Sequence, residues 1–284
     1  MNVRKLLALM ALFPCLMLPY TSYASTPDAV DIAGRQRMLT QKMTKEALLV
    51  GLQPNTASYV QALVASQTLF HSSLQALKSG DSRQNIPKPS SKELRQIGEI
   101  ERLWQPFSSV IDEIAQAKFA SYSAIEQLIS TNDSLLKESN KLVQIMASTV
   151  EDEQDEAKVN RVNLAGRQRM LSQRLAKQAL SVCYHVDFFQ NKNTATQTTS
   201  TFDLVLNGLI NGSELLELEE STTSDEEDKL DEVYRYWSDY LAVINPVLDI
   251  SYSVCSVQQI ALIDKRSLDV LKNMNQAVQI AKAN

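Results

Sequence analysis

One heptapeptide occurs twice in this chain, and this repetition constrains the fold more than any other feature. Residues 33–39 and residues 165–171 both read Ala-Gly-Arg-Gln-Arg-Met-Leu. A hydrophobic core alone would repeat only apolar positions at helical spacing, whereas here a glycine, two arginines and a glutamine recur as well. Such a match is too long for chance in a chain of 284 residues. The repeated polar residues are therefore expected to share a role.

The repeat extends far beyond the heptapeptide. Matched positions lie at offsets of 132, 133 and 135 along the chain, as in the pairs Phe70 and Phe202, Trp104 and Trp237, and Asn140 and Asn275. A slowly growing offset is what small loop insertions between matched helices produce. The chain is therefore interpreted as a tandem duplication of a unit of roughly 120 to 130 residues, a period that decides the fold.

The first 24 residues lie outside the repeat and resemble a secretory signal peptide. Arg4 and Lys5 precede a mostly apolar stretch over residues 6–20, and Ser22-Tyr23-Ala24 resembles a cleavage site. An uncleaved N-terminal anchor is the alternative. No later run of about 20 apolar residues follows, so a soluble exported protein is expected.

The remaining chain is acidic. Removing Arg4 and Lys5 from the 28 basic residues leaves 26 against 33 acidic ones, a net charge of −7. This balance argues against nucleic acid and against general binding to anionic membranes. Any anion that binds must be held by a local site, because the overall field opposes it.

The composition and periodicity predict an all-α protein. Beyond residue 24 the chain has only six prolines and seven glycines, and its apolar residues recur at helical spacing. We expect two tandem four-helix bundles of up-down-up-down topology, over residues 25–148 and 149–284, related by a pseudo-twofold duplication. Helix breaks in the second unit are expected near residues 191–201, 221–224 and 245–246.

The junction between the two units has two interpretations. Ser148 and Glu151 form a capping-box sequence, which predicts that a new helix begins there. A turn at this point would place the two motif helices side by side and parallel. However, no glycine or proline occurs between Pro106 and Gly166, so a continuous helix with the bundles stacked end to end is the alternative. The turn is favoured.

Two cysteines remain beyond the first 24 residues. Cys183 lies near the end of the second motif helix and Cys255 near the start of the last helix. Adjacent antiparallel helices would bring these ends together, so a disulfide is expected in an oxidising compartment; two free buried thiols are the alternative. His71 and His185 have no ligand-like spacing to other histidines or cysteines, so neither a metal site nor a cofactor is expected.

The repeated motif has the chemistry of an anion site. On a helix, Gly34, Arg37 and Gln41 share one face, which Lys45 continues. Glycine lets a second helix approach closely, and the arginine fork suits planar oxyanions. The duplication supplies a second half, Gly166 and Arg169. If the two faces meet, a small planar anion such as nitrate would satisfy both guanidiniums.

A purely structural role for the motif is equally open. Arg35 and Arg37 could pair with carboxylates such as Asp31, as helix charges usually do. Gln41 and Gln173 could line a site or bond across helices. Spacing alone does not decide between the two interpretations.

The decapeptide at residues 165–174, Ala-Gly-Arg-Gln-Arg-Met-Leu-Ser-Gln-Arg, resembles the signature of the PilJ-type sensor domain. This is the N-terminal domain of type IV pili methyl-accepting chemotaxis transducers, and it is related to the periplasmic domain of nitrate and nitrite sensor kinases. Two copies cover essentially the whole chain beyond residue 24. The resemblance implies a periplasmic four-helix bundle that senses small ligands, of which nitrate is the known example.

The resemblance also implies which residues contact the ligand. In nitrate-binding members the glycine and the second arginine of the signature contact the anion across a dimer interface; these are Gly34, Arg37, Gly166 and Arg169 here. A further arginine of the nitrate sensor kinases falls at Lys42 and Arg174, so the two halves are not equivalent. Supporting contacts are expected from Arg35, Gln41, Lys42, Arg167, Gln173 and Arg174.

Two functions follow as expectations. The first is a soluble periplasmic protein that binds or senses nitrate, nitrite or a similar anion and lacks its own output domain. The second is an interaction module that docks a membrane chemoreceptor or sensor kinase without a small ligand. An enzyme is not expected, because the sequence shows no nucleophile-and-base pair, phosphate loop or metal cluster. A homodimer is compatible with either function.

Overall fold

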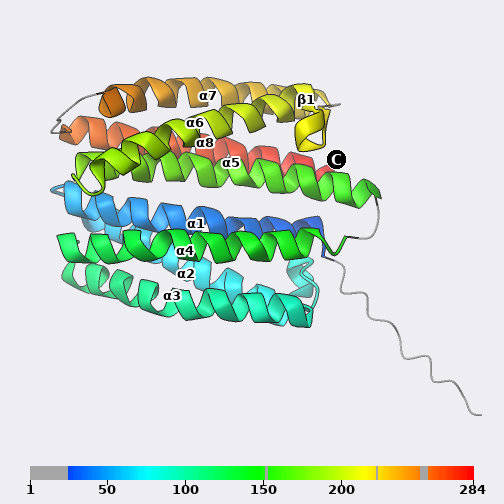
Figure 1. Cartoon of the computed structure of the whole chain (residues 1–284), viewed down its shortest axis with the longest axis horizontal. Coiled ribbons are helices and arrows are strands. Elements are labelled where there is room, and N and C mark those ends of the chain that lie inside the picture. Colours follow the sequence, from blue (N-terminus) through cyan, green and yellow to red (C-terminus); the bar gives the residue numbers. More distant parts are fainter. Residues whose placement is uncertain (1–24, 151–152, 222, 250–254) are drawn as a thin grey trace, which may run out of the picture.

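The computed structural model describes residues 25–150, 153–221, 223–249 and 255–284, so the expected signal peptide over residues 1–24 lies outside the described residues. The predicted all-α class is confirmed (Figure 1). The first unit forms α1 (Pro27–Leu52), α2 (Ala57–Ser79), α3 (Ser91–Ala117) and α4 (Tyr122–Ala147). The second unit forms α5 (Glu153–Cys183), α6 (Phe188–Asn211), α7 (Ser224–Asp249) and α8 (Val257–Ala283).

Local sequence signals account for several helix ends. The hydroxyl of Thr26 accepts the backbone N–H of Ala29 at 3.1 Å, and Pro27 fills the first turn of α1. Capping boxes begin α3 at Ser90 and α8 at Ser256.

The ends of α2 and α6 repeat one another. Each helix ends at a glycine with φ of +75°, Gly80 or Gly212, a backbone conformation that glycine adopts without strain. Each glycine leads into a short 3₁₀ helix, η1 (Ser82–Gln84) or η2 (Glu214–Leu216). An isolated bridge closes the first loop, and the two-stranded ribbon of β1 (Gly212–Ser213) and β2 (Leu218–Glu220) closes the second.

Three details of the helix boundaries correct the sequence analysis. Ser148 does not cap α5: it ends α4, where its backbone N–H bonds to the Gln144 carbonyl and its hydroxyl donates to the Ile145 carbonyl. The polar stretch 191–201 lies inside α6, because Asn191 and Thr198 bond back to carbonyls of the preceding turn. Helix α7 also continues through Pro246 to Asp249.

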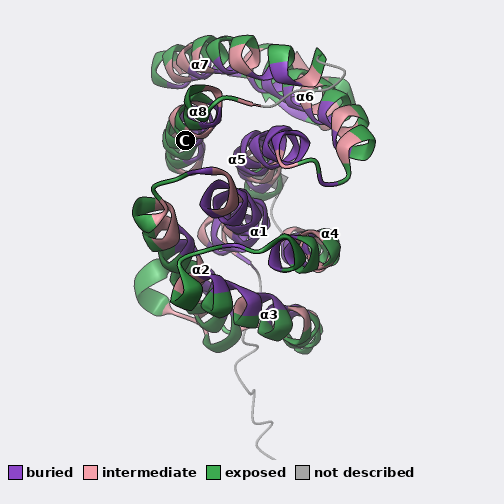
Figure 2. Cartoon of the chain, turned by 90° about the vertical axis from the view of Figure 1, so that its left-hand side faces the viewer, coloured by how far each residue is buried: buried purple, intermediate pink, exposed green. Residues whose placement is uncertain are grey.

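The two units lie side by side, with α1 and α5 at the centre (Figure 2). These two motif helices form the most extensive helix–helix contact of the described structure. Helices α2 and α3 cover one side of this pair, and α6 and α7 cover the other. Twenty of the 26 residues of α1 are buried, because a central helix packs against neighbours around its whole circumference. Polar motif residues are thus enclosed.

Each unit has the same aromatic stack in its core. Phe70 stacks on Trp104 with ring centroids 4.2 Å apart, and Phe202 stacks on Trp237 at 3.7 Å. These four residues are at most 5 % exposed. The matched stacks show that the duplicated sequence produces duplicated packing.

A disulfide joins Cys183, at the end of α5, to Cys255, just before α8. The two Cα atoms are 5.4 Å apart and the cysteines are separated by 72 positions. In the chain-entropy account, closing a loop of this length stabilises a fold by about 4 kcal/mol. The bond fixes the start of α8 against the motif helix.

Candidate functional site

The two repeated glycines lie where α1 and α5 touch. A Cβ atom added to Gly34 would be 3.2 Å from Nη2 of Arg37 and 3.8 Å from Nη2 of Arg169. A Cβ added to Gly166 would be 3.1 Å from Nη2 of Arg169 and 3.7 Å from Nη2 of Arg37. The two guanidiniums therefore converge on one glycine pair, which requires α1 and α5 to run parallel at the same level.

Each arginine contacts two neighbours in a repeated pattern. Arg37 donates from Nη1 to Oδ1 of Asn140 at 3.1 Å and from Nη2 to the backbone carbonyl of Asn163 at 3.3 Å. Arg169 donates from Nη1 to Oδ1 of Asn275 at 3.3 Å and from Nη2 to Oδ1 of Asp31 at 2.6 Å. Asn140 matches Asn275 in the repeat, and Asn163 matches Asp31. The two arginines and their partners are therefore related by pseudo-twofold symmetry. The two halves differ in that one partner is the acidic Asp31 and its match is the neutral Asn163.

Asp31 neutralises only one side of this pair. Its carboxylate is 1 % exposed and also lies 3.8 Å from Arg35 and 3.3 Å from Lys282. Burial opposes its ionisation, but Arg169, Arg35 and Lys282 outweigh burial and lower the pKa of Asp31 below its usual value. Asp31 pairs with Arg35, as expected from the sequence. Its second arginine partner is Arg169 and not Arg37.

Arg37 is the uncompensated member. It is 2 % exposed, and it makes no ion pair with any residue that the structure describes. Burial first, then repulsion from Arg169 and Arg167, lowers the pKa of Arg37 to about 9. The Nε atoms of Arg37 and Arg169 are buried without a hydrogen-bond partner. An unpaired buried charge of this kind is costly unless a counter-ion meets it.

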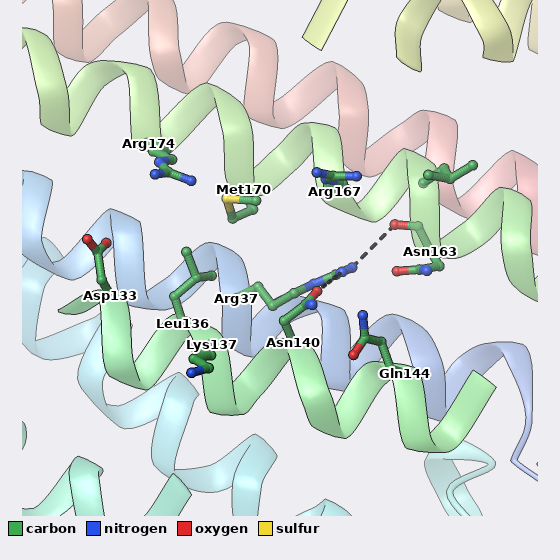
Figure 3. Close-up of a pocket in the computed structure, with 11 residues that line it drawn as sticks. Arg37, Asp133, Leu136, Lys137, Asn140, Gln144, Asn163, Arg167, Met170 and Arg174 are labelled. Atoms are coloured by element: carbon green, nitrogen blue, oxygen red, sulfur yellow. Dashed lines mark hydrogen bonds between the residues drawn. The ribbon is translucent and has the colours of Figure 1, made fainter. Parts of the chain in front are cut away.

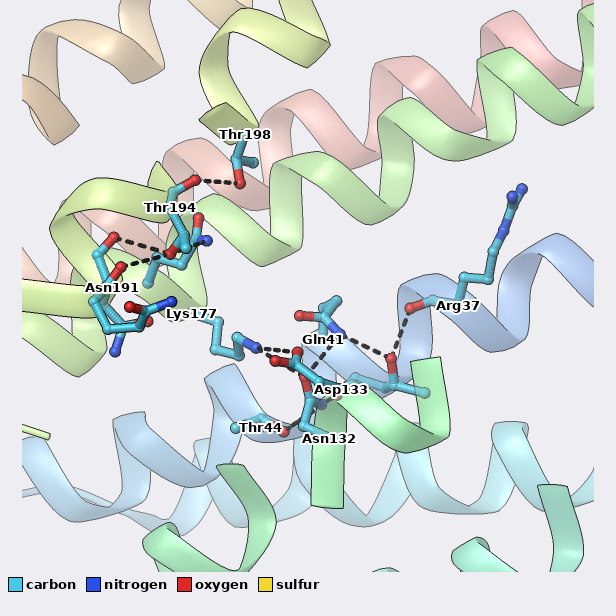
Figure 4. A network of polar contacts seen from close by, with 12 residues as sticks. Arg37, Gln41, Thr44, Asn132, Asp133, Lys177, Asn191, Thr194 and Thr198 are labelled. Carbon is cyan, nitrogen blue, oxygen red and sulfur yellow. Dashed lines mark hydrogen bonds and ion pairs between the residues drawn. The ribbon is translucent and has the colours of Figure 1, made fainter. Parts of the chain in front are cut away.

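A second polar layer lies about two turns further along the same helices (Figure 4). Lys45 of α1 donates to Asp264 at 2.7 Å and Ser267 at 3.3 Å, both on α8. Lys177 of α5 donates to Asn132 of α4 at 2.8 Å. Each motif helix thus binds the fourth helix of the other unit. These contacts hold the two bundles in register.

The expected supporting residues separate into three groups. Gln41 and Gln173 donate to Asn132 and to the Ser267 carbonyl, so they bond across helices rather than line an anion site. Lys42 pairs with Glu46 and Ser66, away from the glycine pair. Arg35 belongs with Lys42 in the second group, because it too pairs with an acid of its own helix, Asp31. The third group, Arg167 and Arg174, lines a separate pocket.

This pocket of about 460 Å³ lies between α4 and α5 (Figure 3). Arg37 reaches into it from α1, beside Asn140 and Asn163. The pocket thus adjoins Arg37, the arginine that has no carboxylate partner among the described residues. The sequence alone does not identify Asn140, Asn163 and Asn275 as partners of the arginines, although two of them are matched asparagines in the repeat.

Comparison with known proteins places the chain among sensory domains rather than catalytic ones. The sequence profile of the PilJ family, described as "Type IV pili methyl-accepting chemotaxis transducer N-term", matches residues 22–148 and again residues 153–261. The chain therefore belongs to this family, in two tandem copies. Domains of this family are typically periplasmic sensing domains. Among the described helices, none combines the length and apolar composition needed to cross a lipid bilayer.

One relative is the methyl-accepting chemotaxis protein McpN of Pseudomonas aeruginosa. A segment of 136 residues is 29 % identical to it and covers 48 % of this chain but only 25 % of that protein. The chain thus matches about a quarter of the relative's length. No solved structure matches the chain significantly.

Proposed function

We propose that this chain is a periplasmic sensory protein that binds one small planar anion, nitrate or nitrite, between Arg37 and Arg169. The observation that carries the proposal is the convergence of two buried guanidiniums on the Gly34–Gly166 pair with a single carboxylate, Asp31, beside them. Asp31 pairs with Arg169, whereas no carboxylate of the described residues pairs with Arg37. A monovalent anion would supply the missing negative charge.

The geometry supports a planar oxyanion in particular. A guanidinium presents its donors in one plane, and flat anions accept from such a fork without distorting it. The glycines keep the space beside both Nη2 atoms free of side chains. Burial removes competing water, which strengthens an interaction between opposite charges. Anion binding would also relieve the repulsion between the two arginines that lowers the pKa of Arg37.

Titration calorimetry of residues 25–284, stripped of bound anions, tests this proposal with nitrate as the probe. We expect one nitrate per chain, and at least tenfold weaker binding in Arg37→Met. Arg102→Ala is the control, because Arg102 is exposed and forms an ion pair with Glu99 of its own helix, far from the glycine pair in sequence. Unchanged nitrate affinity in a folded Arg37→Met/Arg169→Met variant would overturn the proposal.

Docking of a membrane receptor is the second candidate function. Three aromatic side chains are exposed at one end of the molecule, where α3 meets α4 and α5 meets α6 (Figure 1): Phe119 (60 %), Tyr122 (50 %) and Phe189 (75 %). Exposed aromatic residues are typical of protein interfaces. A photo-crosslinker at position 189 that traps a chemoreceptor or sensor kinase in cells would support docking, and a crosslinker at exposed position 102 is the control. Absence of any receptor adduct would argue against it.

A further inference from the structure

The α4–α5 pocket has more positive charge than the proposed nitrate site uses. Arg37 lies at its floor, Arg174 is half-buried in its wall, and Arg167 and Lys137 are exposed at its rim (Figure 3). Asp133 is the one acidic residue among the residues that line it. Its side chain is 74 % exposed and lies 3.7 Å from Lys177 rather than against the arginines.

None of the four cations that line the pocket forms an ion pair within the described part of the chain. The Nε atoms of Arg37 and Arg174 are buried and have no hydrogen-bond partner. Burial and repulsion from Arg174 lower the pKa of Arg167. Unpaired cations in one pocket repel each other, so this arrangement favours an anion from outside the chain.

The duplication supplies an internal comparison, because the pseudo-twofold partner of this pocket is the face between α8 and α1. There, three of the four matched cations have an acid: Arg35 and Arg169 pair with Asp31, and Lys42 pairs with Glu46. The fourth matched cation is Lys272, the counterpart of Lys137. On the α4–α5 side the positions that match these two acids are neutral, namely Asn163 and Gln178. Three cations of the α8–α1 face therefore have acidic partners, whereas the matching Arg37, Arg167 and Arg174 have none among the described residues.

The shape and lining of the pocket indicate the size of the missing anion. A volume of about 460 Å³ is far larger than nitrate needs and falls within the range of small-molecule sites, roughly 300 to 1,000 Å³. Leu136, Leu164 and Met170 form an apolar part of the wall, while Asn140 and Gln144 add amide groups. Such a lining suits an organic scaffold with several oxyanion groups better than a bare inorganic ion.

We propose that the α4–α5 pocket is a second ligand site that binds a small organic anion with two or three carboxylates. The Arg37, Arg167 and Arg174 guanidiniums receive the carboxylates, and Lys137 closes the rim. The site shares Arg37 with the nitrate proposal but does not involve Arg169. With four cations in its lining, the pocket has enough positive charge for an anion with two or three carboxylates.

Calorimetric titration of residues 25–284 with citrate tests this site, with acetate at equal ionic strength as the monovalent comparison. We expect saturable citrate binding and at least tenfold weaker binding in Arg167→Gln/Arg174→Gln. The charge-matched control is Lys265→Gln/Lys272→Gln, which removes two lysines from α8; Lys272 matches Lys137 in the repeat. This control should retain citrate affinity within about threefold.

Three results would overturn the proposed organic-anion site: citrate that binds no more tightly than acetate, an equal loss of citrate affinity in both double variants, or inorganic pyrophosphate that binds as tightly as citrate. Arg169→Met separates the two proposals, because it should weaken nitrate and spare citrate. Circular dichroism of each variant verifies that a lost affinity is not lost folding. A chain that binds nitrate but not citrate would leave the nitrate site standing and remove this one.

Discussion

The two converging arginines should respond in opposite directions to the same substitution. Methionine at either position removes the charge and keeps most of the volume, so the effect of a cavity is small. Arg169→Met would leave the buried Asp31 with Arg35 at 3.8 Å and Lys282 at 3.3 Å as its cations, and with a hydrogen bond from Gln279 at 3.4 Å. Arg37→Met would instead remove a buried cation that has no carboxylate partner.

The magnitudes follow from these contacts. Burial, and then repulsion from Arg169 and Arg167, lowers the pKa of Arg37 to about 9, which at about 1.4 kcal/mol per pKa unit disfavours the charged form by on the order of 5 kcal/mol. Losing its hydrogen bonds to Asn140 and Asn163 costs about 1 kcal/mol each. Arg37→Met should therefore stabilise the anion-free protein by roughly 2 to 3 kcal/mol. Arg169→Met should destabilise it by about 3 kcal/mol or more, the usual cost of breaking a buried pair.

Thermal unfolding of anion-stripped protein at pH 7, followed by circular dichroism, measures the difference. At roughly 2 to 4 °C per kcal/mol for a protein of this size, the two Tm values should be separated by at least 10 °C. Asp31→Asn in the Arg169→Met background should recover part of the lost stability, because no buried carboxylate is then left unpaired. Equal destabilisation by both single variants would refute the assigned asymmetry.

Three further predictions concern other parts of the structure. Burial lowers the pKa of Lys177 from 10.5 to about 8, while Asp133 opposes this shift and Arg174 adds to it. The unfolded chain therefore binds this proton more tightly than the folded chain, so the free energy of unfolding should rise by up to about 3 kcal/mol between pH 8 and 10. Denaturant titrations at a series of pH values should show a smaller rise in Lys177→Met. Cys183→Ser should lower stability by about 4 kcal/mol, and dithiothreitol should then have no further effect on Tm, unlike in the parent protein. Gly34→Ala should weaken nitrate binding at least tenfold in calorimetry, since the new methyl group would lie 3.2 Å from Nη2 of Arg37, whereas Gly98→Ala, which meets nothing within 4 Å, should leave it unchanged.

Composition and helical periodicity are enough to predict the helical class, and the repeated heptapeptide predicts that the two arginines can meet. Identical residues at one offset predict equivalent positions in the two units. A helix face that carries a glycine and an arginine has few possible packing partners once it is buried. The errors arose where local polarity was read as a helix end. Asn191 and Thr198 are polar, yet both are buried and satisfy their side chains within α6.

The partners of the arginines could not be predicted, because they depend on how α4 and α8 are rotated about their axes. Asn140 and Asn275 lie in ordinary amphipathic helices, and nothing in their local sequence distinguishes them from solvent-facing asparagines. Asp31 was recognised as a candidate carboxylate, but only the packing of α5 against α1 assigns it to Arg169. The pocket is likewise a product of packing between helices that are distant in sequence.

The central α1–α5 pair also changes how occupancy depends on protein concentration. A site formed between two separate subunits exists only where they associate, so its apparent affinity falls on dilution. Here a peptide link between the units holds both halves together at a fixed effective concentration. Under the proposed function, occupancy of the site would therefore depend on the concentration of the ligand and not on that of the protein. Each half is also encoded separately, so one arginine can acquire an acid such as Asp31 while the other remains unmatched.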